Sequence, residues 1–133
     1  MSVTTDPIAD LLTRIRNGLI ADHDDVVMPA STFKAEVARI LTEQGYVEGF
    51  AVEPARVGHV LRVTLKYTED RKPVITGIER LSTPGRRRYV DADTIPKIFG
   101  GMGTAIISTS QGVMTGHDAR RARVGGELVA RVW

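Results

Sequence analysis

The feature that most limits the possible folds is the stretch 104–115, TAIISTSQGVMT. It begins with a β-branched, apolar run, which is typical of a buried strand. Three hydroxyl residues then follow in succession: Ser108, Thr109 and Ser110. Gly112 lets another backbone approach closely, and Thr115 can cap a helix. We therefore predict a strand that carries uncharged hydrogen-bonding groups at its end, a combination suited to 2′-hydroxyls, base edges and phosphate oxygens.

The first half of the chain predicts a two-layer α/β unit. Apolar residues at helical spacing indicate helices over 7–18 and 31–45, each ended by a glycine. Short apolar runs indicate strands at 26–28, 46–52 and 60–67, and in the last run apolar and polar residues alternate. The resulting order, helix–strand–helix–strand–strand, is sufficient to form two layers.

A polar, highly charged segment closed by a proline, Thr68–Pro73, is the best candidate for a domain boundary. The charge changes sign there, because residues 1–70 carry a formal charge of −4 and residues 71–133 carry +6. We predict two small domains, 1–68 and 69–133. An arginine-rich half favours a polyanionic partner, since guanidinium groups pair with phosphate bidentately. Charge alone leaves a solvated basic surface equally open.

The second half predicts a mainly antiparallel β-sheet with short helices, so the fold class of the whole chain is α+β. Strands are indicated at 74–81 and 127–133, and a helix is indicated after Thr115. Three arginines precede an aromatic residue: Arg86, Arg87, Arg88 and Tyr89. This group suits phosphate contact and stacking on an unpaired base. It would also serve as an edge strand kept soluble by charge.

The sequence offers little for catalysis or metal binding. It has no cysteine, and its three histidines stand at no ligand spacing. Asp22, Asp24 and Asp25 resemble the start of a calcium loop, but the places that need glycine and glutamate hold Val27 and Phe33. We expect no enzyme, no cofactor, no metal and no small-molecule substrate, and the apolar runs are too short to span a membrane. A protein–protein adaptor and a small hydrolase or transferase with a hydroxyl nucleophile stay open as alternatives.

Two segments near opposite ends of the chain resemble small-subunit ribosomal protein number eight, in its bacterial form. The first is 6–17, DPIADLLTRIRN, and the second is 108–115, STSQGVMT, followed by 125–128, GGEL. The similarity runs from Asp6 to the C-terminus. One departure follows Thr115, where the family tends to place an acidic residue and this chain has Gly116.

The resemblance implies a two-domain structural constituent of the small ribosomal subunit, located in the cytoplasm. It implies direct binding to the central domain of the small-subunit rRNA early in assembly. Neighbouring small-subunit proteins, such as protein five, would be further partners. Family members can also repress translation of their own operon by binding an mRNA that mimics the rRNA site.

The resemblance also implies which residues contact the rRNA. In the C-terminal half these are Ser108, Thr109, Ser110, Gly112, Tyr89, Gly125, Gly126 and Glu127. The arginines at 86–88 would extend the phosphate footprint. Lesser contacts are implied in the N-terminal half for Thr4, Ser31 and Lys34. For the acidic Glu127 we expect either that it orients the hydroxyl tip or that it accepts a hydrogen bond from a base amino group.

Overall fold

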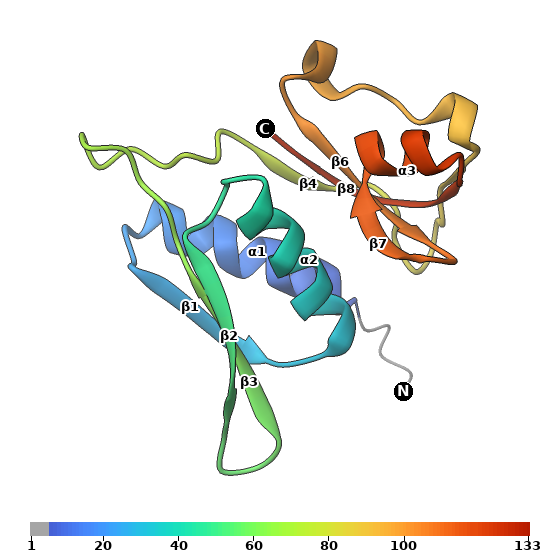
Figure 1. Ribbon diagram of the computed structural model, residues 1–133. Helices are drawn as coiled ribbons and strands as arrows, with labels where there is room; N and C mark the ends of the chain where they lie inside the picture. Colours follow the sequence, from blue (N-terminus) through green and yellow to red (C-terminus); the bar gives the residue numbers. More distant parts are fainter. Residues whose placement is uncertain (1–5) are drawn as a thin grey trace. The chain divides into compact units, whose positions relative to one another are not determined.

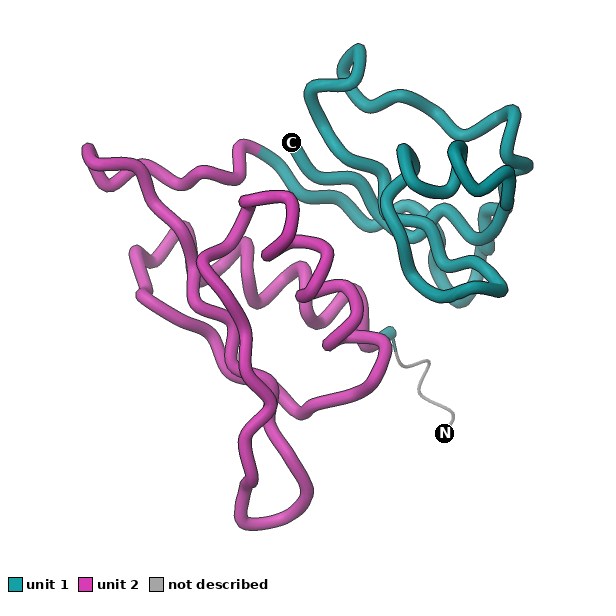
Figure 2. The backbone as a smooth tube through the Cα atoms, viewed as in Figure 1, with its two compact units in different colours: residues 1–6, 77–133 teal, residues 7–76 magenta. Residues whose placement is uncertain are grey.

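The computed structural model describes residues 6–133, which form helices and antiparallel sheets (Figure 1). The predicted α+β class is confirmed. The chain divides into two compact units, residues 7–76 and residues 77–133, with Asp6 assigned to the second (Figure 2). The domain boundary expected after Thr68 stays a prediction, since compactness alone does not show which segment folds independently. Among the described residues, no helix is long and apolar enough to cross a membrane.

The N-terminal unit is a three-stranded sheet with two helices on one face (Figure 1). Its elements are α1 (Pro7–Ile20), β1 (Asp25–Pro29), α2 (Thr32–Glu43), β2 (Gly49–Pro54) and β3 (His59–Thr64). The sheet order is β1-β3-β2, and both strand pairs are antiparallel. Leu61 and Val63 on β3 are fully buried, as the alternating pattern predicted, and they meet the apolar faces of the helices.

Helix α1 continues through Gly18 to Ile20, so the predicted end of the helix at Gly18 is wrong. The glycine serves packing instead. A Cβ atom at this position would lie 2.5 Å from Cγ1 of Val26 and 3.0 Å from Cδ1 of Leu65. Gly18 therefore lets β1 approach the helix closely. The glycine that we expected to end the helix is instead the point where the helix contacts a strand.

Lys34 joins the two helices from inside the unit. Its side chain is 6% exposed, and Nζ donates to Oδ2 of Asp10 and to the carbonyl oxygen of Pro29, both at 3.0 Å. Arg14 Nε donates to the other carboxylate oxygen of Asp10 at 3.0 Å. Burial raises the pKa of Asp10, but hydrogen bonds and charge from Arg14 and Lys34 outweigh burial, and the pKa lies below its ordinary value.

The C-terminal unit is one antiparallel sheet with the strand order β4-β8-β6-β7, in which β5 also pairs with β8. Its strands are β4 (Ile78–Arg80), β5 (Tyr89–Val90), β6 (Thr104–Thr109), β7 (Gly112–Thr115) and β8 (Gly126–Val132). Its helices are α3 (Gly116–Ala122) and two short 3-10 turns, Ala92–Thr94 and Ile98–Gly101. As predicted, Thr115 caps α3 by accepting from the backbone N–H of Asp118 at 3.1 Å.

Strand β4 is shorter than the predicted 74–81, because β8 offers it partners only from Ala130 to Val132. One apolar cluster forms the core between the sheet and α3. It consists of Ile95, Ile98, Ala105, Ile107, Ala119 and Leu128. The tip of the β6–β7 hairpin thus projects from strands that are fixed by a packed core.

The Lys34–Asp10 contact predicts unequal losses from removing its two partners. Asp10→Asn leaves a buried ammonium without its carboxylate and should lower the free energy of unfolding by about 2 kcal/mol at neutral pH. Lys34→Met keeps the volume and leaves Asp10 bonded to Arg14, so the loss should stay below about 1.5 kcal/mol. Urea unfolding of both variants measures the difference.

The pH dependence checks the same contact. Because the pKa of Asp10 is lowered in the folded state, the advantage of the parent protein over Asp10→Asn should be complete above the ordinary carboxyl pKa. It should disappear as the pH falls through the lowered value. Equal losses in the two variants at neutral pH would contradict this account.

Candidate nucleic-acid interface

The hydroxyl stretch forms the tip of the β6–β7 hairpin. Ser108 pairs with Val113 and Thr109 pairs with Gly112 across the two strands. Thr109 holds the turn together, because its Oγ1 donates to the carbonyl oxygen of Gly112 at 2.8 Å and accepts from the N–H of Gln111 at 3.0 Å. Gly112 has φ of 113°, a conformation that favours glycine. Two of the residues predicted to bind RNA therefore also build the turn.

The tip is open to solvent. Ser110 and Gly112 are exposed, and Ser108 and Thr109 are half-buried. Within residues 6–133, no protein group forms a hydrogen bond with the hydroxyl of Ser108 or Ser110. These two hydroxyls can therefore bind an external partner without breaking a bond inside the protein.

The glycine pair at the start of β8 brings three strands together. A Cβ atom on Gly126 would lie 2.2 Å from the carbonyl oxygen of Ser108, and one on Gly125 would lie 2.3 Å from that of Val90. Neither position tolerates a side chain without a backbone shift. Both glycines thus have a packing role in the structure, whatever their contact with RNA.

Three predicted site residues stand side by side across these strands. Glu127 on β8 pairs with Tyr89 on β5 and with Ser108 on β6. Side chains of residues directly opposite in an antiparallel ladder point to the same face of the sheet, about 5 Å apart. The structure therefore groups an exposed aromatic ring, a carboxylate and a free hydroxyl on one face, with Tyr89 72% exposed.

Glu127 is held by residues from the segment before β5. Its Oε2 accepts from the hydroxyl of Ser82 and, at 2.9 Å, from Nη1 of Arg87. The fully buried Ser82 in turn accepts from the backbone N–H of Arg88 at 3.1 Å. The carboxylate thus fixes the loop that leads to Tyr89 and is neutralised by Arg87. One of our expectations was that Glu127 orients the hydroxyl tip, but its carboxylate bonds Ser82 and Arg87 instead.

The three successive arginines do not form one patch. All are exposed, but Arg87 pairs with Glu127, whereas the side chain of Arg88 lines a pocket of the same unit. Arg86 lies in the tight turn closed by its backbone bonds with Thr83, at 3.0 and 3.1 Å. The charge next to the hydroxyl tip is therefore lower than the sequence predicts.

Of the site residues predicted in the N-terminal half, Ser31 and Lys34 belong to the other compact unit. Ser31 caps α2 by accepting from the backbone N–H of Lys34 at 3.1 Å. Lys34 is buried and bonded to Asp10 and Pro29, so its surroundings do not support the expected contact with phosphate. Thr4 lies outside the described residues.

Two features of the structure, one in each compact unit, were not predicted. Nothing in the local sequence marks Ser82 as the buried link between Arg88 and Glu127. Asp22 and Asp24 each accept from Arg71 at 2.8 Å, and these bonds raise the pKa of Arg71. Ion pairing thus accounts for the acidic loop that resembled a calcium site.

Comparison with known families matches residues 6–133 to the family described as Ribosomal protein S8. The protein named Small ribosomal subunit protein uS8 of Anaeromyxobacter sp. (strain K) is 49% identical over 129 residues, which cover 97% of this chain and 98% of the relative. The protein of that name from Solibacter usitatus is 50% identical over 131 residues, covering 98% and 100%. That from Syntrophomonas wolfei is 50% identical over 132 residues, covering 98% and 99%.

Substitution of two serines in the C-terminal unit should change stability by different amounts. Ser82→Ala removes a fully buried hydroxyl, leaves the Arg88 N–H unpaired and takes one of two donors from Oε2 of Glu127, which should cost about 1–3 kcal/mol. Ser110→Ala removes an exposed hydroxyl and should change the free energy of unfolding by less than about 0.5 kcal/mol. Urea or thermal unfolding measures both. Equal stability of the two variants would mean that the Ser82 bonds contribute nothing.

Proposed function

Because the chain belongs to the Ribosomal protein S8 family, we propose that it binds small-subunit rRNA directly through the face formed by β5, β8 and the β6–β7 tip. The resemblance noted in the sequence is confirmed by this membership. As a member of the family, the protein is a structural constituent of the small ribosomal subunit in the cytoplasm and is not an enzyme.

One observation carries the proposal. Among the residues that the structure describes, the hydroxyls of Ser108 and Ser110 have no protein partner at an open strand end, and the exposed ring of Tyr89 lies on the same face as Ser108. An adaptor or a hydrolase gives no reason for this pairing of free hydroxyls with an exposed aromatic ring. An RNA ligand offers 2′-hydroxyls and bases for both.

The mechanism is recognition of RNA shape with little reading of base sequence. An A-form helix hides its major groove and displays 2′-hydroxyls across a shallow minor groove, where short hydroxyl side chains on a fixed strand end can reach them. Tyr89 offers a face for an unstacked base. Since Arg87 already neutralises Glu127, the net positive charge that attracts phosphate comes from other arginines, which add affinity but little discrimination.

The finer assignments follow from the family. The bound RNA would be the central domain of the small-subunit rRNA, joined early in assembly, and protein five would be among the neighbours. An mRNA helix of the same shape would occupy the same face, and the protein would thereby repress its own operon. Footprinting of the purified protein on complete small-subunit rRNA tests the proposal, because it predicts one protected, distorted helix. Uniform weak protection would contradict it.

The free hydroxyls predict a loss of affinity that does not depend on charge. The double variant Ser108→Ala with Ser110→Ala should bind the protected rRNA fragment about 1–3 kcal/mol more weakly, because RNA groups lose their partners. The salt dependence of binding should stay the same, since no cation is removed. Filter binding or calorimetry over a salt series measures both quantities.

Thr13→Ala is the control for this variant, because it removes an exposed hydroxyl from α1 in the other unit. It should bind the fragment with the affinity of the parent protein. Parent affinity in a folded double variant would overturn the assignment of the tip.

The ring of Tyr89 predicts a difference between two substitutions. Tyr89→Ala should weaken binding by about 1–3 kcal/mol if one base stacks on the ring. Tyr89→Phe keeps the ring and should retain most of the affinity. The side chain is 72% exposed, so neither change should unfold the protein, which circular dichroism checks. Equal losses in both variants would assign the effect to the hydroxyl group instead.

A further inference from the structure

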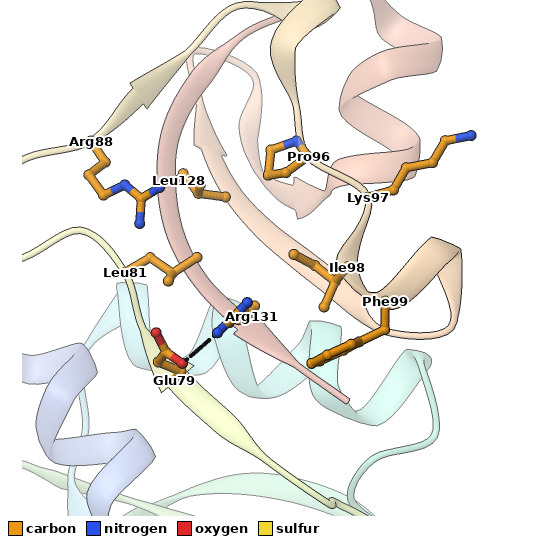
Figure 3. A pocket seen from close by; sticks show the side chains of 9 residues that line it. All are labelled: Glu79, Leu81, Arg88, Pro96, Lys97, Ile98, Phe99, Leu128 and Arg131. Atoms are coloured by element: carbon orange, nitrogen blue, oxygen red, sulfur yellow. Dashed lines mark hydrogen bonds and ion pairs between the residues drawn. The ribbon is translucent and has the colours of Figure 1, made fainter.

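A pocket of about 250 Å³ lies in the C-terminal unit on the face of β8 opposite to Glu127 (Figure 3). We call it the β8 groove. Its lining residues are Glu79, Leu81, Arg88, Pro96, Lys97, Ile98, Phe99, Leu128 and Arg131. This volume falls below the usual range of about 300–1,000 Å³ for cofactor and small-molecule sites. The groove is therefore suited to one or two side chains of a larger partner.

An irregularity in β8 creates the floor of the groove. Leu128 pairs with Ile107 and Arg131 pairs with Ala105, and the register shifts between Ile106 and Ile107. Because Ala105 and Ile107 are two residues apart on β6, Leu128 and Arg131 share a face although three positions separate them. An apolar and a cationic side chain thereby line the same hollow.

The apolar part of the groove is continuous with the protein core. Leu128 and Ile98 belong to the core cluster, and Leu81 packs against it. In Figure 3 Leu81, Leu128 and Ile98 lie around the hollow, each on a different segment, and Pro96 is on the same segment as Ile98. An apolar side chain placed here would remove more hydrocarbon surface from water.

Among the described residues that line the groove, Arg88 is the cation that faces inward without a bonded acceptor. Arg131 pairs with Glu79 at 2.9 Å, so these two charges neutralise one another. Within residues 6–133, no acceptor bonds the guanidinium of Arg88, and in Figure 3 it reaches into the groove. Lys97 stands at the rim and points outward (Figure 3). A partner that binds here would complete the groove with a negative group.

Phe99, which lines one side of the groove, has an unusual backbone conformation. Phe99 has φ of 48° and ψ of 50°, the left-handed region that costs energy for a residue with a side chain. Its ring is exposed by 54% and lies 5.0 Å from the ring of Trp133, centroid to centroid. Backbone strain that keeps an aromatic ring in solvent is typical of sites that make contacts.

We propose that the β8 groove binds an acidic peptide segment of a neighbouring protein, with an apolar side chain on Leu81 and Leu128 and a carboxylate on Arg88. RNA fits less well, because sugar and phosphate gain nothing from an apolar floor and Glu79 places a carboxylate beside Arg131. This surface is on the opposite face of β8 from the proposed rRNA contacts, and the inference does not depend on them.

Photo-crosslinking in assembled small subunits tests the inference. The probe is p-benzoylphenylalanine in place of Phe99, an exposed aromatic position at the wall. After irradiation, mass spectrometry should find a crosslink to a protein segment that contains Asp or Glu beside an apolar residue. Crosslinks to rRNA alone, to a segment without a carboxylate, or to nothing would overturn the proposal.

Charge reversal then identifies the contact. Arg88→Glu should lower the crosslink yield about ten-fold or more, as expected for a lost charge pair. Arg56→Glu, an exposed arginine of the other unit, should leave the yield unchanged. Lysine in place of the captured carboxylate should restore the yield with Arg88→Glu, an outcome that RNA cannot produce. Failure of this restoration would refute the assigned pair.

A second measurement uses the protein's single tryptophan. Trp133 lies against Phe99, so its fluorescence reports on the groove. A synthetic peptide of the captured segment should shift the emission of the full-length protein on titration. The same peptide with its acids changed to amides should bind about ten-fold more weakly. Equal binding of both peptides would contradict the role of Arg88, whether or not the rRNA site is correctly placed.

Discussion

The close approach of three strands at Gly125 and Gly126 is the constraint on which the C-terminal unit depends. With only hydrogen at these positions, β8 can begin between the carbonyl oxygens of Val90 and Ser108. The strands on either side then bring Tyr89 and the hydroxyl tip into register with Glu127. The distance between aromatic ring and hydroxyl is thus fixed by backbone packing, and rigid placement is what recognition of a rigid RNA helix requires.

The bonds around Glu127 explain why an acidic residue can stand on a face that approaches phosphate. Ser82 and Arg87 both donate to its carboxylate, so the negative charge is shared within the protein. The same bonds hold the segment that positions Tyr89. An alanine at 127 would leave Arg87 free but would also release this segment. The gain in positive charge would therefore come with a loss of order.

The sequence predicted what local patterns encode. The alternation of apolar and polar residues predicted the buried face of β3. The hydroxyl stretch predicted the tip of the β6–β7 hairpin and Thr115 as a helix cap. It could not show which side chains find partners far along the chain. The sequence does not show that Lys34 is buried, because its partner Asp10 lies on another helix. It also places Arg87 and Arg88 next to each other, although Arg87 bonds Glu127 and Arg88 lines the groove on the other face of β8. For the same reason the sequence could not show whether a glycine ends an element or allows a close contact, because the atoms it contacts belong to other elements.

The irregularity in β8 gives one strand two functional faces. With regular alternation, Glu127 and Arg131 would project to the same side, since four residues separate them. The shift in register moves Arg131 to the side of Leu128 and leaves Glu127 with Ser108. The face of β8 that carries Glu127 therefore lacks the Arg131 side chain, and the opposite face has this cation next to apolar side chains. Because the two faces share the backbone of β8 but no side chain, each can be altered by substitution without removing a side chain from the other.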